Sequence, residues 1–377
     1  MKMRNNLRIL HTESSCGWGG QEIRILNEAA GFIARGHQVE LVCSPDSEIA
    51  SAAERLNIPV HKLPIEKKTL SALRAMRKWL SNNQFRFDLI NTHSSTDSWL
   101  CALANLTLSA SLPIVRTRHV STPVNSSFTT KWLYRSATKH IVTTGERLRQ
   151  QLAKQNGFVL KRMTSIPTGV DFKVFHPLEK SECRHKLGIS DVGQFTIGIV
   201  ATLRSWKGHT DLFDALAIIN GGIPWQLVVV GDGPYEETLH KKVTSLNLEG
   251  QIKFVGRQSN VAEWLNTFDL FCLPSYGEEG VPQSIMQAMS CGVPVISTPI
   301  GSISEAVLDG ETGILVPARD TARLADALYK LMNDDGLRER MGQASLKYAR
   351  QTFDMNVMLD KMEHAFYQAL VGVKNDE

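Results

Sequence analysis

Hydrophobic and polar residues follow two alternating patterns along the chain. Short apolar runs, which are typical of strands buried on both faces, recur throughout. Between them lie longer stretches in which apolar residues recur every three or four positions, the spacing of the buried face of a helix. The runs that we expect to be strands are 7–11, 39–43, 88–93, 114–117, 140–144, 195–201, 226–230, 252–255, 268–273, 293–297 and 314–316. Buried strands that alternate with helices predict an α/β fold with parallel sheets.

The stretch 268–297 is the most informative part of the chain. An apolar run at 268–273 leads into an acidic, glycine-containing loop, and another apolar run follows at 293–297. Pro282 suits the first position of the intervening helix, where its missing N–H removes no hydrogen bond. Ligands of open α/β sheets bind at the carboxyl ends of strands, where this loop lies. Its N–H groups and the helix N-terminus suit a phosphate, and its carboxylates suit hydroxyl groups.

The order of residues in this stretch resembles the signature of the retaining glycosyltransferases of family four. That signature is a glutamate, seven residues, a second glutamate and then A-M-A-x-G-x-P-V. From Glu279 this chain reads E-G-V-P-Q-S-I-M-Q-A-M-S-C-G-V-P-V, so Gln287 stands in place of the second acid. Gln283 lies one turn before Gln287, and both amides can face a ligand rather than the core. The resemblance implies the GT-B fold, in which two Rossmann-like, doubly wound domains face each other across a cleft.

A junction near residue 175 divides the chain into two predicted domains. The segment I-P-T-G-V-D at 166–171 resembles the I-P-N-G-V-D with which the family passes from one domain to the next. We expect an acceptor-binding domain at 1–175 and a nucleotide-sugar-binding domain at 176–354. The resemblance also implies that a helix at 355–377 crosses back and packs on the first domain.

The implied reaction moves a sugar from a UDP- or GDP-linked donor to a hydroxyl of a glycan or lipid-linked acceptor, with retention of configuration. No cofactor is expected, and no metal, since the chain has no H-E-x-x-H, no D-x-D pair and no Cys/His cluster. Bacterial cell-envelope polysaccharide or lipopolysaccharide biosynthesis is the implied setting. Two alternatives stay open: a nucleotide-sugar epimerase or hydrolase of the same fold, and a non-catalytic protein that binds nucleotide sugars or glycans.

Several positions match donor-binding positions of the family. Lys207 follows a strand in G-I-V-A-T-L-R-S-W-K-G and is placed to contact a diphosphate as a point charge. The family has an arginine where this chain has Thr202, and Arg204 is the candidate replacement. Both cations would otherwise be ordinary exposed residues at the start of a helix. The donor set implied by the resemblance is Gly20, Arg204, Lys207, Gly231, Gly233, Arg257, Glu279, Gly280, Val281, Pro282, Gln283, Gln287 and Glu305.

The first half of the chain carries the remaining candidates. Gly19 and Glu22 match a glycine turn that the family places near the acceptor, and His93, the last residue of the predicted strand 88–93, is a further candidate on the acceptor side. His119 follows another strand in R-T-R-H-V-S and matches the histidine that contacts the transferred sugar in relatives. A lone histidine is more often structural, so that alternative stays open for both histidines. The residues expected to take part in catalysis are His119, Glu279 and Lys207.

Charge is distributed unevenly between the two halves. Residues 1–170 contain 23 Lys and Arg but 11 Asp and Glu, a formal charge of +12, whereas the remainder carries −8. A basic half suggests an anionic partner, such as a membrane surface, a phosphorylated acceptor or nucleic acid. A solvated surface of uneven charge explains the pattern equally well. With the glycosyltransferase resemblance in view, we expect no nucleic-acid partner.

Compartment is indicated by cysteine usage and by the apolar runs. The six cysteines show no C-x-x-C spacing, and no apolar run approaches the roughly 20 residues of a membrane-spanning helix. The first residues lack the apolar core of a signal peptide. We therefore expect a reduced, cytoplasmic protein that lies peripherally on the inner face of the cytoplasmic membrane.

Overall fold

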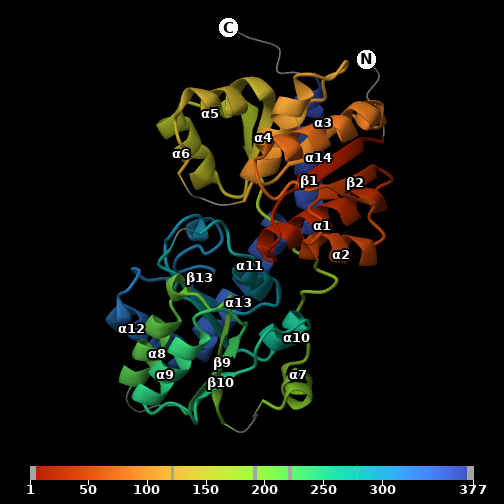
Figure 1. Cartoon of the computed structure of the whole chain (residues 1–377). Coiled ribbons are helices and arrows are strands. Elements are labelled where there is room, and N and C mark those ends of the chain that lie inside the picture. Colours follow the sequence, from red (N-terminus) through yellow and green to blue (C-terminus); the bar gives the residue numbers. More distant parts are fainter. Residues whose placement is uncertain (1–5, 120–122, 190–192, 220–222, 278, 372–377) are drawn as a thin grey trace. The chain divides into compact units, whose positions relative to one another are not determined.

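The computed structural model describes residues 6–119, 123–189, 193–219, 223–277 and 279–371. The chain divides into two compact units, which can be followed by colour in Figure 1. Unit 1 comprises Met1–Gly169 together with Asn356–Glu377, and unit 2 comprises Val170–Met355. The first division falls at Gly169, some residues before the junction expected near residue 175.

Unit 1 is built on a parallel sheet of seven strands in the order β3-β2-β1-β4-β5-β6-β7. The strands are β1 (Arg8–Glu13), β2 (Gln38–Cys43), β3 (Val60–Lys62), β4 (Leu89–Thr92), β5 (Ile114–Arg118), β6 (Thr138–Thr143) and β7 (Met163–Ser165). Most residues of the central strands are buried, as the unbroken apolar runs predict. The strand order reverses between β1 and β4, so the carboxyl ends of these two strands form a topological switch point, where α/β sheets bind ligands.

Helices of unit 1 connect most successive strands, because neighbouring parallel strands need a crossover connection. They are α1 (Gly20–Ala34), α2 (Glu48–Arg55), α3 (Leu70–Asn83), α4 (Ser95–Asn105), α5 (Phe128–Trp132) and α6 (Glu146–Asn156), with short segments η1 (Gln84–Arg86), η2 (Leu133–Ala137) and η3 (Leu160–Arg162).

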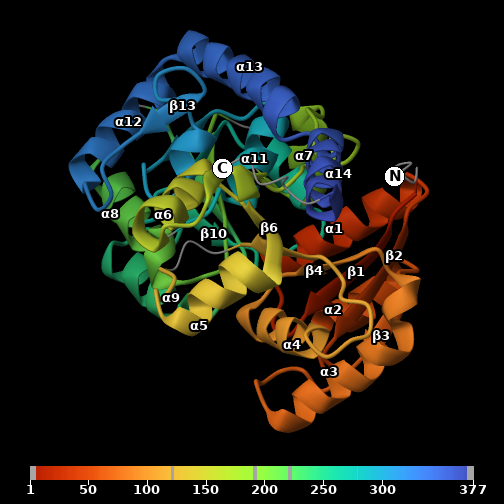
Figure 2. The same cartoon turned by 90° about the horizontal axis from the view of Figure 1, so that it is seen from above.

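The last helix, α14 (Met355–Val371), lies beside α1, as Figures 1 and 2 both show. A Cβ atom on Gly31 would lie 2.6 Å from a methyl carbon of Leu359, so the two helices pack closely at this glycine. Arg24, which is fully buried, donates to the backbone oxygen of Ile166 at 2.7 Å and places its other terminal nitrogen 3.7 Å from Met362 Sδ. The C-terminal helix is therefore part of the core of unit 1.

Unit 2 is built on a parallel sheet of six strands in the order β10-β9-β8-β11-β12-β13. The strands are β8 (Phe195–Val200), β9 (Trp225–Val230), β10 (Ile252–Phe254), β11 (Leu270–Leu273), β12 (Val295–Ser297) and β13 (Gly313–Leu315). A Cβ atom on Gly198 would lie 2.0 Å from the ring of Phe268, so this strand position has no room for a side chain. Here the order reverses between β8 and β11, which places a second switch point at their carboxyl ends.

The helices of unit 2 include one, α11, that follows the acidic loop singled out in the sequence. They are α7 (Lys180–Leu187), α8 (His209–Ile218), α9 (Glu236–Ser245), α10 (Val261–Asn266), α11 (Gln283–Ser290), α12 (Thr321–Asn333) and α13 (Asp335–Thr352), with short segments η4 (Ser205–Lys207) and η5 (Ile303–Glu305).

Every run expected to be a strand overlaps one, so the prediction of two α/β units with parallel sheets is confirmed. Two strands, β3 and β7, were not predicted. Both have three residues, lie at the edges of the unit 1 sheet and are only partly buried, so they lack a long apolar run. The expectation for Pro282 is corrected by one position: it precedes α11 with extended backbone (ψ 130°), and the helix begins at Gln283.

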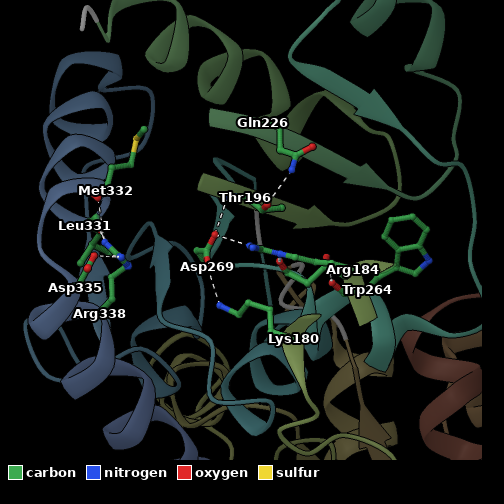
Figure 3. A network of polar contacts seen from close by, with 11 residues as sticks. Lys180, Arg184, Thr196, Gln226, Trp264, Asp269, Leu331, Met332, Asp335 and Arg338 are labelled. Atoms are coloured by element: carbon green, nitrogen blue, oxygen red, sulfur yellow. Dashed lines mark hydrogen bonds and ion pairs between the residues drawn. The ribbon is translucent and has the colours of Figure 1, made fainter. Parts of the chain in front are cut away.

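Asp269 fastens α7 to the amino end of the unit 2 sheet, as Figure 3 shows. Its carboxylate accepts from Lys180 Nζ at 2.7 Å, from Arg184 Nη2 at 2.7 Å and from the backbone N–H of Thr196 at 2.8 Å. Burial alone would raise the pKa of Asp269, but Lys180, Arg184 and these hydrogen bonds hold it below its ordinary value. The ionised carboxylate is therefore the form that stabilises this unit.

Replacing Asp269 with alanine should lower the free energy of unfolding by about 3 kcal/mol, because two cations lose their shared partner. Replacing Glu237 with alanine breaks an ion pair whose side chains are 75% and 83% exposed, and should cost less than about 1 kcal/mol. Because the pKa of Asp269 is lowered on folding, the cost of Asp269→Ala should shrink as pH falls below about 4. Urea denaturation measures both variants, and equal costs for the two would contradict the prediction.

Candidate functional site

Loops at the carboxyl edge of the unit 2 sheet touch one another through backbone atoms. Gly208 has a φ of 76°, and a Cβ atom there would lie 2.1 Å from the backbone oxygen of Pro274. Gly301 has a φ of 59°, and a Cβ atom there would lie 1.9 Å from the backbone oxygen of Glu279, which also accepts from Ser302 N–H at 3.1 Å. The loops that follow β8, β11 and β12 are thereby held in close contact.

An ion pair between Lys207 and Glu279 lies where these loops meet. Lys207 Nζ is 2.6 Å from Glu279 Oε1, which also accepts from Ser275 Oγ at 3.0 Å. The side chains of Lys207 and Glu279 are 19% and 11% exposed, so both remain partly accessible. An ammonium group has three protons, and a single carboxylate oxygen engages one of them. The structure thus brings together two predicted residues that are far apart in the sequence.

Helix α11 turns its apolar residues to the core and its amides away from it. Ile285 and Met289 are fully buried, whereas Gln283 and Gln287 are half-buried. The N-terminal turn of α11 begins four residues after Glu279, and its N–H groups form the positive end of the helix. The loop residues before it share one feature, partial or complete burial: Gly280, Val281 and Pro282.

Glycines at the end of β9 are required by packing between strands. Gly231 and Gly233 have φ values of 136° and 156°, and Cβ atoms there would lie 2.0 Å from the oxygen of Ala201 and 2.6 Å from that of Leu203. These contacts account for both glycines without a ligand. They also fix the loop after β8, which carries Lys207.

The remaining donor-side candidates lie nearer the surface. Arg204 is exposed, with its guanidinium 5.3 Å from the centre of the Trp206 ring, and Arg257 is exposed after β10. Glu305 is half-buried in η5, and its backbone oxygen accepts from Tyr348 Oη at 2.9 Å. Whether Arg204 takes the place of the family arginine remains a prediction.

Three histidines form a hydrogen-bonded chain at the switch point of unit 1. His11 lies near the carboxyl end of β1, His93 follows β4 and His119 follows β5. His11 Nδ1 lies 2.8 Å from His93 Nε2, and His93 Nδ1 lies 2.9 Å from His119 Nε2. Burial lowers the pKa of His11 to about 3 and lowers the pKa values of His93 and His119 well below their ordinary value. All three rings are therefore neutral at neutral pH.

A buried carboxyl group lies at the inner end of this chain. Glu28 Oε1 is 3.9 Å from His11 Nε2 and accepts from Asn91 Nδ2 at 3.2 Å, while Arg24 Nε lies 3.8 Å from its other oxygen. Burial raises the pKa of Glu28 to about 7, against the opposing effect of Arg24. Because each neutral imidazole carries one proton, the tautomers of the three rings are linked, and the outermost ring is His119.

The glycine turn of unit 1 lies next to a second buried acid, Glu13. Gly19 precedes α1 with extended backbone, and a Cβ atom there would meet Glu22 at an ordinary 3.7 Å, so packing does not require this glycine. Gly20 is the first residue of α1, and Glu22 is buried. Glu13 accepts from Ser94 Oγ, from Gln21 Nε2 and, at 2.7 Å, from the N–H of Ser15. Burial raises the pKa values of both Glu13 and Glu22.

Sequence reasoning missed several polar residues of this edge, namely His11, Glu13, Glu28 and Asp97. One signal was available: the apolar run of β1 ends in three polar residues, His-Thr-Glu, that are all buried. A strand that turns polar at its carboxyl end is typical of a ligand-binding edge.

Two doubly wound α/β units of this kind, with an acidic loop and a lysine at one sheet edge, define the GT-B class of glycosyltransferase fold. Residues 18–174 match the family model described as Glycosyltransferase Family 4, and residues 182–348 match the model described as Glycosyl transferases group 1. The chain belongs to this glycosyltransferase family.

Similar proteins include two bacterial relatives and a solved structure. The chain is 31% identical over 225 residues to the N-acetyl-alpha-D-glucosaminyl L-malate synthase of Bacillus anthracis, covering 60% of this chain and 58% of that one. It is 35% identical over 192 residues to the lipopolysaccharide core biosynthesis mannosyltransferase LpsB of Rhizobium meliloti, covering 48% and 53%. The alignments thus span little more than half the length of these relatives. Anabaena Alr3699/HepE in complex with UDP and glucose superimposes with a TM-score of 0.84 at 22% identity, covering 96% of this chain and all of that one.

Within the part of the chain that the structure describes, no helix combines the length and the apolar character that crossing a bilayer demands.

Substitutions at the two ends of the histidine chain should respond to pH in opposite ways. The cost of His11→Gln should fall by about 1.4 kcal/mol per pH unit below pH 6.5, because unfolded His11 gains a proton that the folded ring does not. The cost of Glu28→Gln should instead grow as pH falls from about 7 to about 4.5, since folded Glu28 keeps a proton that the unfolded chain releases. Urea denaturation across this range measures both costs.

Costs that change in the same direction for the two variants would contradict the assignment of a neutral His11 beside a protonated Glu28. Costs independent of pH would contradict it as well.

Proposed function

We propose that the protein is a retaining glycosyltransferase. It would transfer a sugar from a UDP- or GDP-linked donor to an acceptor hydroxyl, and it would act in cell-surface glycan or lipopolysaccharide biosynthesis. The Lys207–Glu279 pair at the carboxyl edge of the unit 2 sheet carries this proposal, because it joins a cation suited to a diphosphate with a carboxylate suited to sugar hydroxyls.

Each donor-side group has a proposed role. Lys207 and the N-terminal N–H groups of α11 would bind the diphosphate, and Glu279 would accept from hydroxyls of the donor sugar. Gln287 would hold the ribose, accepting through its oxygen and donating through its nitrogen. In unit 1, neutral His119 is assigned to a hydroxyl of the transferred sugar.

The chemical step would be a front-side displacement. The bond between the anomeric carbon and the diphosphate oxygen breaks, and a bond to the acceptor oxygen forms on the same face of the sugar, which retains the configuration. The proton of the acceptor hydroxyl passes to the leaving diphosphate. Lys207 and the helix N-terminus would stabilise the negative charge that develops on that leaving group, which is usually the largest contribution to catalysis.

The ligands and activities of similar proteins support this proposal. The Anabaena structure contains UDP and glucose, and the Rhizobium relative is a mannosyltransferase of the lipopolysaccharide core. The Bacillus relative is a synthase of N-acetyl-alpha-D-glucosaminyl L-malate. For this chain, the donor, the retention of configuration and the pathway are proposals.

A panel of UDP- and GDP-linked sugars tests the proposal, with and without an acceptor extract. Release of UDP or GDP that requires the extract, with the sugar recovered on a component of it, would support transfer. Release without extract indicates a hydrolase, and conversion of the nucleotide sugar without release indicates an epimerase. Binding without any reaction would indicate a non-catalytic protein that binds nucleotide sugars.

Nucleotide affinity should depend on Lys207 and Gln287. Lys207→Ala should weaken binding of the nucleoside diphosphate and slow transfer at least about tenfold, about 1.4 kcal/mol. Gln287→Glu should cost at most about tenfold, whereas Gln287→Leu should cost more because the ribose hydroxyls lose their partner. Calorimetric titration with UDP and GDP measures affinity, and Lys241→Ala on exposed α9 provides the matched control.

An affinity of Gln287→Leu equal to that of the unmodified protein would show that this residue does not meet the nucleotide. Unchanged affinity and unchanged transfer rate in Lys207→Ala would remove that lysine from the site.

The basic character of the first half suits a peripheral position on an anionic bilayer. Exposed Arg74, Arg77 and Lys78 share helix α3. Co-sedimentation with vesicles should then require anionic lipid and fall steeply with added salt. Replacing the three residues by glutamine should reduce it. Equal recovery with neutral and anionic vesicles would leave the charge as a property of the solvated surface.

A further inference from the structure

A buried guanidinium group lies on β5 of unit 1. Arg116 is 4% exposed, and its Nε and Nη1 atoms are shielded from solvent with no hydrogen-bond partner among the described residues. Its guanidinium carbon lies 4.7 Å from the centre of the Tyr134 ring. Burying a charge without a bonded group of opposite charge is costly, and structural arginines are normally paired.

Two further cationic groups, Lys68 and Arg118, interact electrostatically with Arg116. Lys68 Nζ donates to Ser95 Oγ at 3.0 Å and is thereby held at the N-terminus of α4, which is itself the positive end of a helix. Burial, and after it the charge of Arg116, lowers the pKa of Lys68. Arg118, two residues along β5, donates to Tyr134 Oη at 3.1 Å. An ammonium group at a helix N-terminus beside a guanidinium is an arrangement that favours an anion.

The neighbouring carboxyl group supplies little compensation. Asp97, in the first turn of α4, accepts from Thr12 Oγ1 at 2.7 Å and from His93 N–H at 2.9 Å. Burial, together with the charge of Glu13, raises the pKa of Asp97 to about 8, against the opposing effects of its hydrogen bonds and of Arg116, so that its protonated form predominates at neutral pH. Among the described residues, no hydrogen bond or ion pair joins Asp97 to Arg116.

These groups lie at the edge of the sheet where α/β folds bind their ligands. Arg116 pairs in register with Thr92 at the end of β4, and the chain passes directly from there through His93 to Ser95. Lys68 approaches from the segment between β3 and α3. Arg116, Lys68 and the N-terminus of α4 therefore converge at the same carboxyl edge as the histidine chain.

We propose that Arg116, Lys68 and the N-terminus of α4 form a subsite for an oxyanion, a phosphate or a carboxylate, that belongs to the acceptor. That the anion belongs to an acceptor rests on the proposed function. The existence of the anion site does not. It assigns the substrate class: an acidic acceptor, whose charged group is held by unit 1 so that a nearby hydroxyl is presented for transfer.

Binding of inorganic phosphate tests the subsite directly. The titration is made by calorimetry in a Lys207→Ala background without nucleotide sugar, so that the lysine of unit 2 does not contribute. Arg116→Met and Lys68→Met should each weaken phosphate binding at least tenfold. Arg55→Met, which removes an exposed arginine from α2 of the same unit, should leave the affinity within twofold. Unchanged affinity in both Arg116→Met and Lys68→Met would overturn the proposal.

Stability separates a binding role from a structural one. A methionine keeps the unbranched stem of Arg116 without its guanidinium, and replacing a buried charge by an apolar group of similar volume is often neutral or stabilising. Arg116→Met should therefore melt at the same temperature as its parent, or higher, in chloride buffer, and should lose the rise in melting temperature that phosphate gives the parent. A lower melting temperature with the phosphate response retained would overturn the proposal. Lys68→Met, at an exposed position, keeps the test valid should Arg116→Met fail to fold.

Titrations with other anionic probes identify the source of the anion. Malonate in place of phosphate reports on carboxylates, and vesicles of phosphatidylglycerol report on a lipid headgroup. A tenfold loss in Arg116→Met with any of these probes supports the subsite, and the probe that binds most tightly gives the source. In the otherwise unmodified enzyme, Arg116→Met should raise the KM for the acceptor and leave that for the nucleotide sugar unchanged. Absence of transfer would refute the proposed function but not the phosphate titration.

Discussion

The functional chemistry of both units depends on one constraint, the shared direction of parallel strands. Because all strands of a sheet point the same way, every strand-to-helix loop leaves the sheet at the same edge, and reversal of the strand order opens that edge at one point. In unit 1 the reversal lies between β1 and β4, and in unit 2 between β8 and β11. The histidine chain and the Lys207–Glu279 pair occur at these two places. Residues distant in the sequence meet there because their loops leave the sheet at the same edge.

The two edges consist of different kinds of chemical group. In unit 2, glycines bring backbone against backbone, and the polar side chains lie on a framework of main-chain contacts. In unit 1, the edge consists of buried ionisable groups whose pKa values are shifted toward their neutral forms, such as His11 and Glu28. Under the proposed function, the edge of unit 2 would meet the nucleotide diphosphate, a constant ligand, and the edge of unit 1 would meet the acceptor. The contrast fits a division of labour between donor and acceptor recognition.

Much of this fold follows from the sequence, because fully buried strands produce unbroken apolar runs that local reading detects. Edge strands such as β3 do not, since part of their surface is exposed and they are only three residues long. The residues of the candidate site were found through motif resemblance, but their pairings were not. That Lys207 contacts Glu279, or that His93 bonds to both His11 and His119, depends on strand order, which no local pattern contains. Buried polar residues such as Arg116 were missed because the sequence of a strand does not show whether a guanidinium on it is buried or paired.

The place of α14 in the core of unit 1 has a consequence for how the chain folds as it is made. Unit 2 is one continuous segment, so all of it has been synthesised before α14 is translated. Unit 1 is interrupted: the surface of α1 around Gly31 and Arg24 is covered by Leu359 and Met362, which are translated after unit 2. Domains usually fold in the order of synthesis, at roughly 5–20 residues per second. Here the first unit to emerge is the last to be completed, and until α14 is made the face of α1 that it covers stays open.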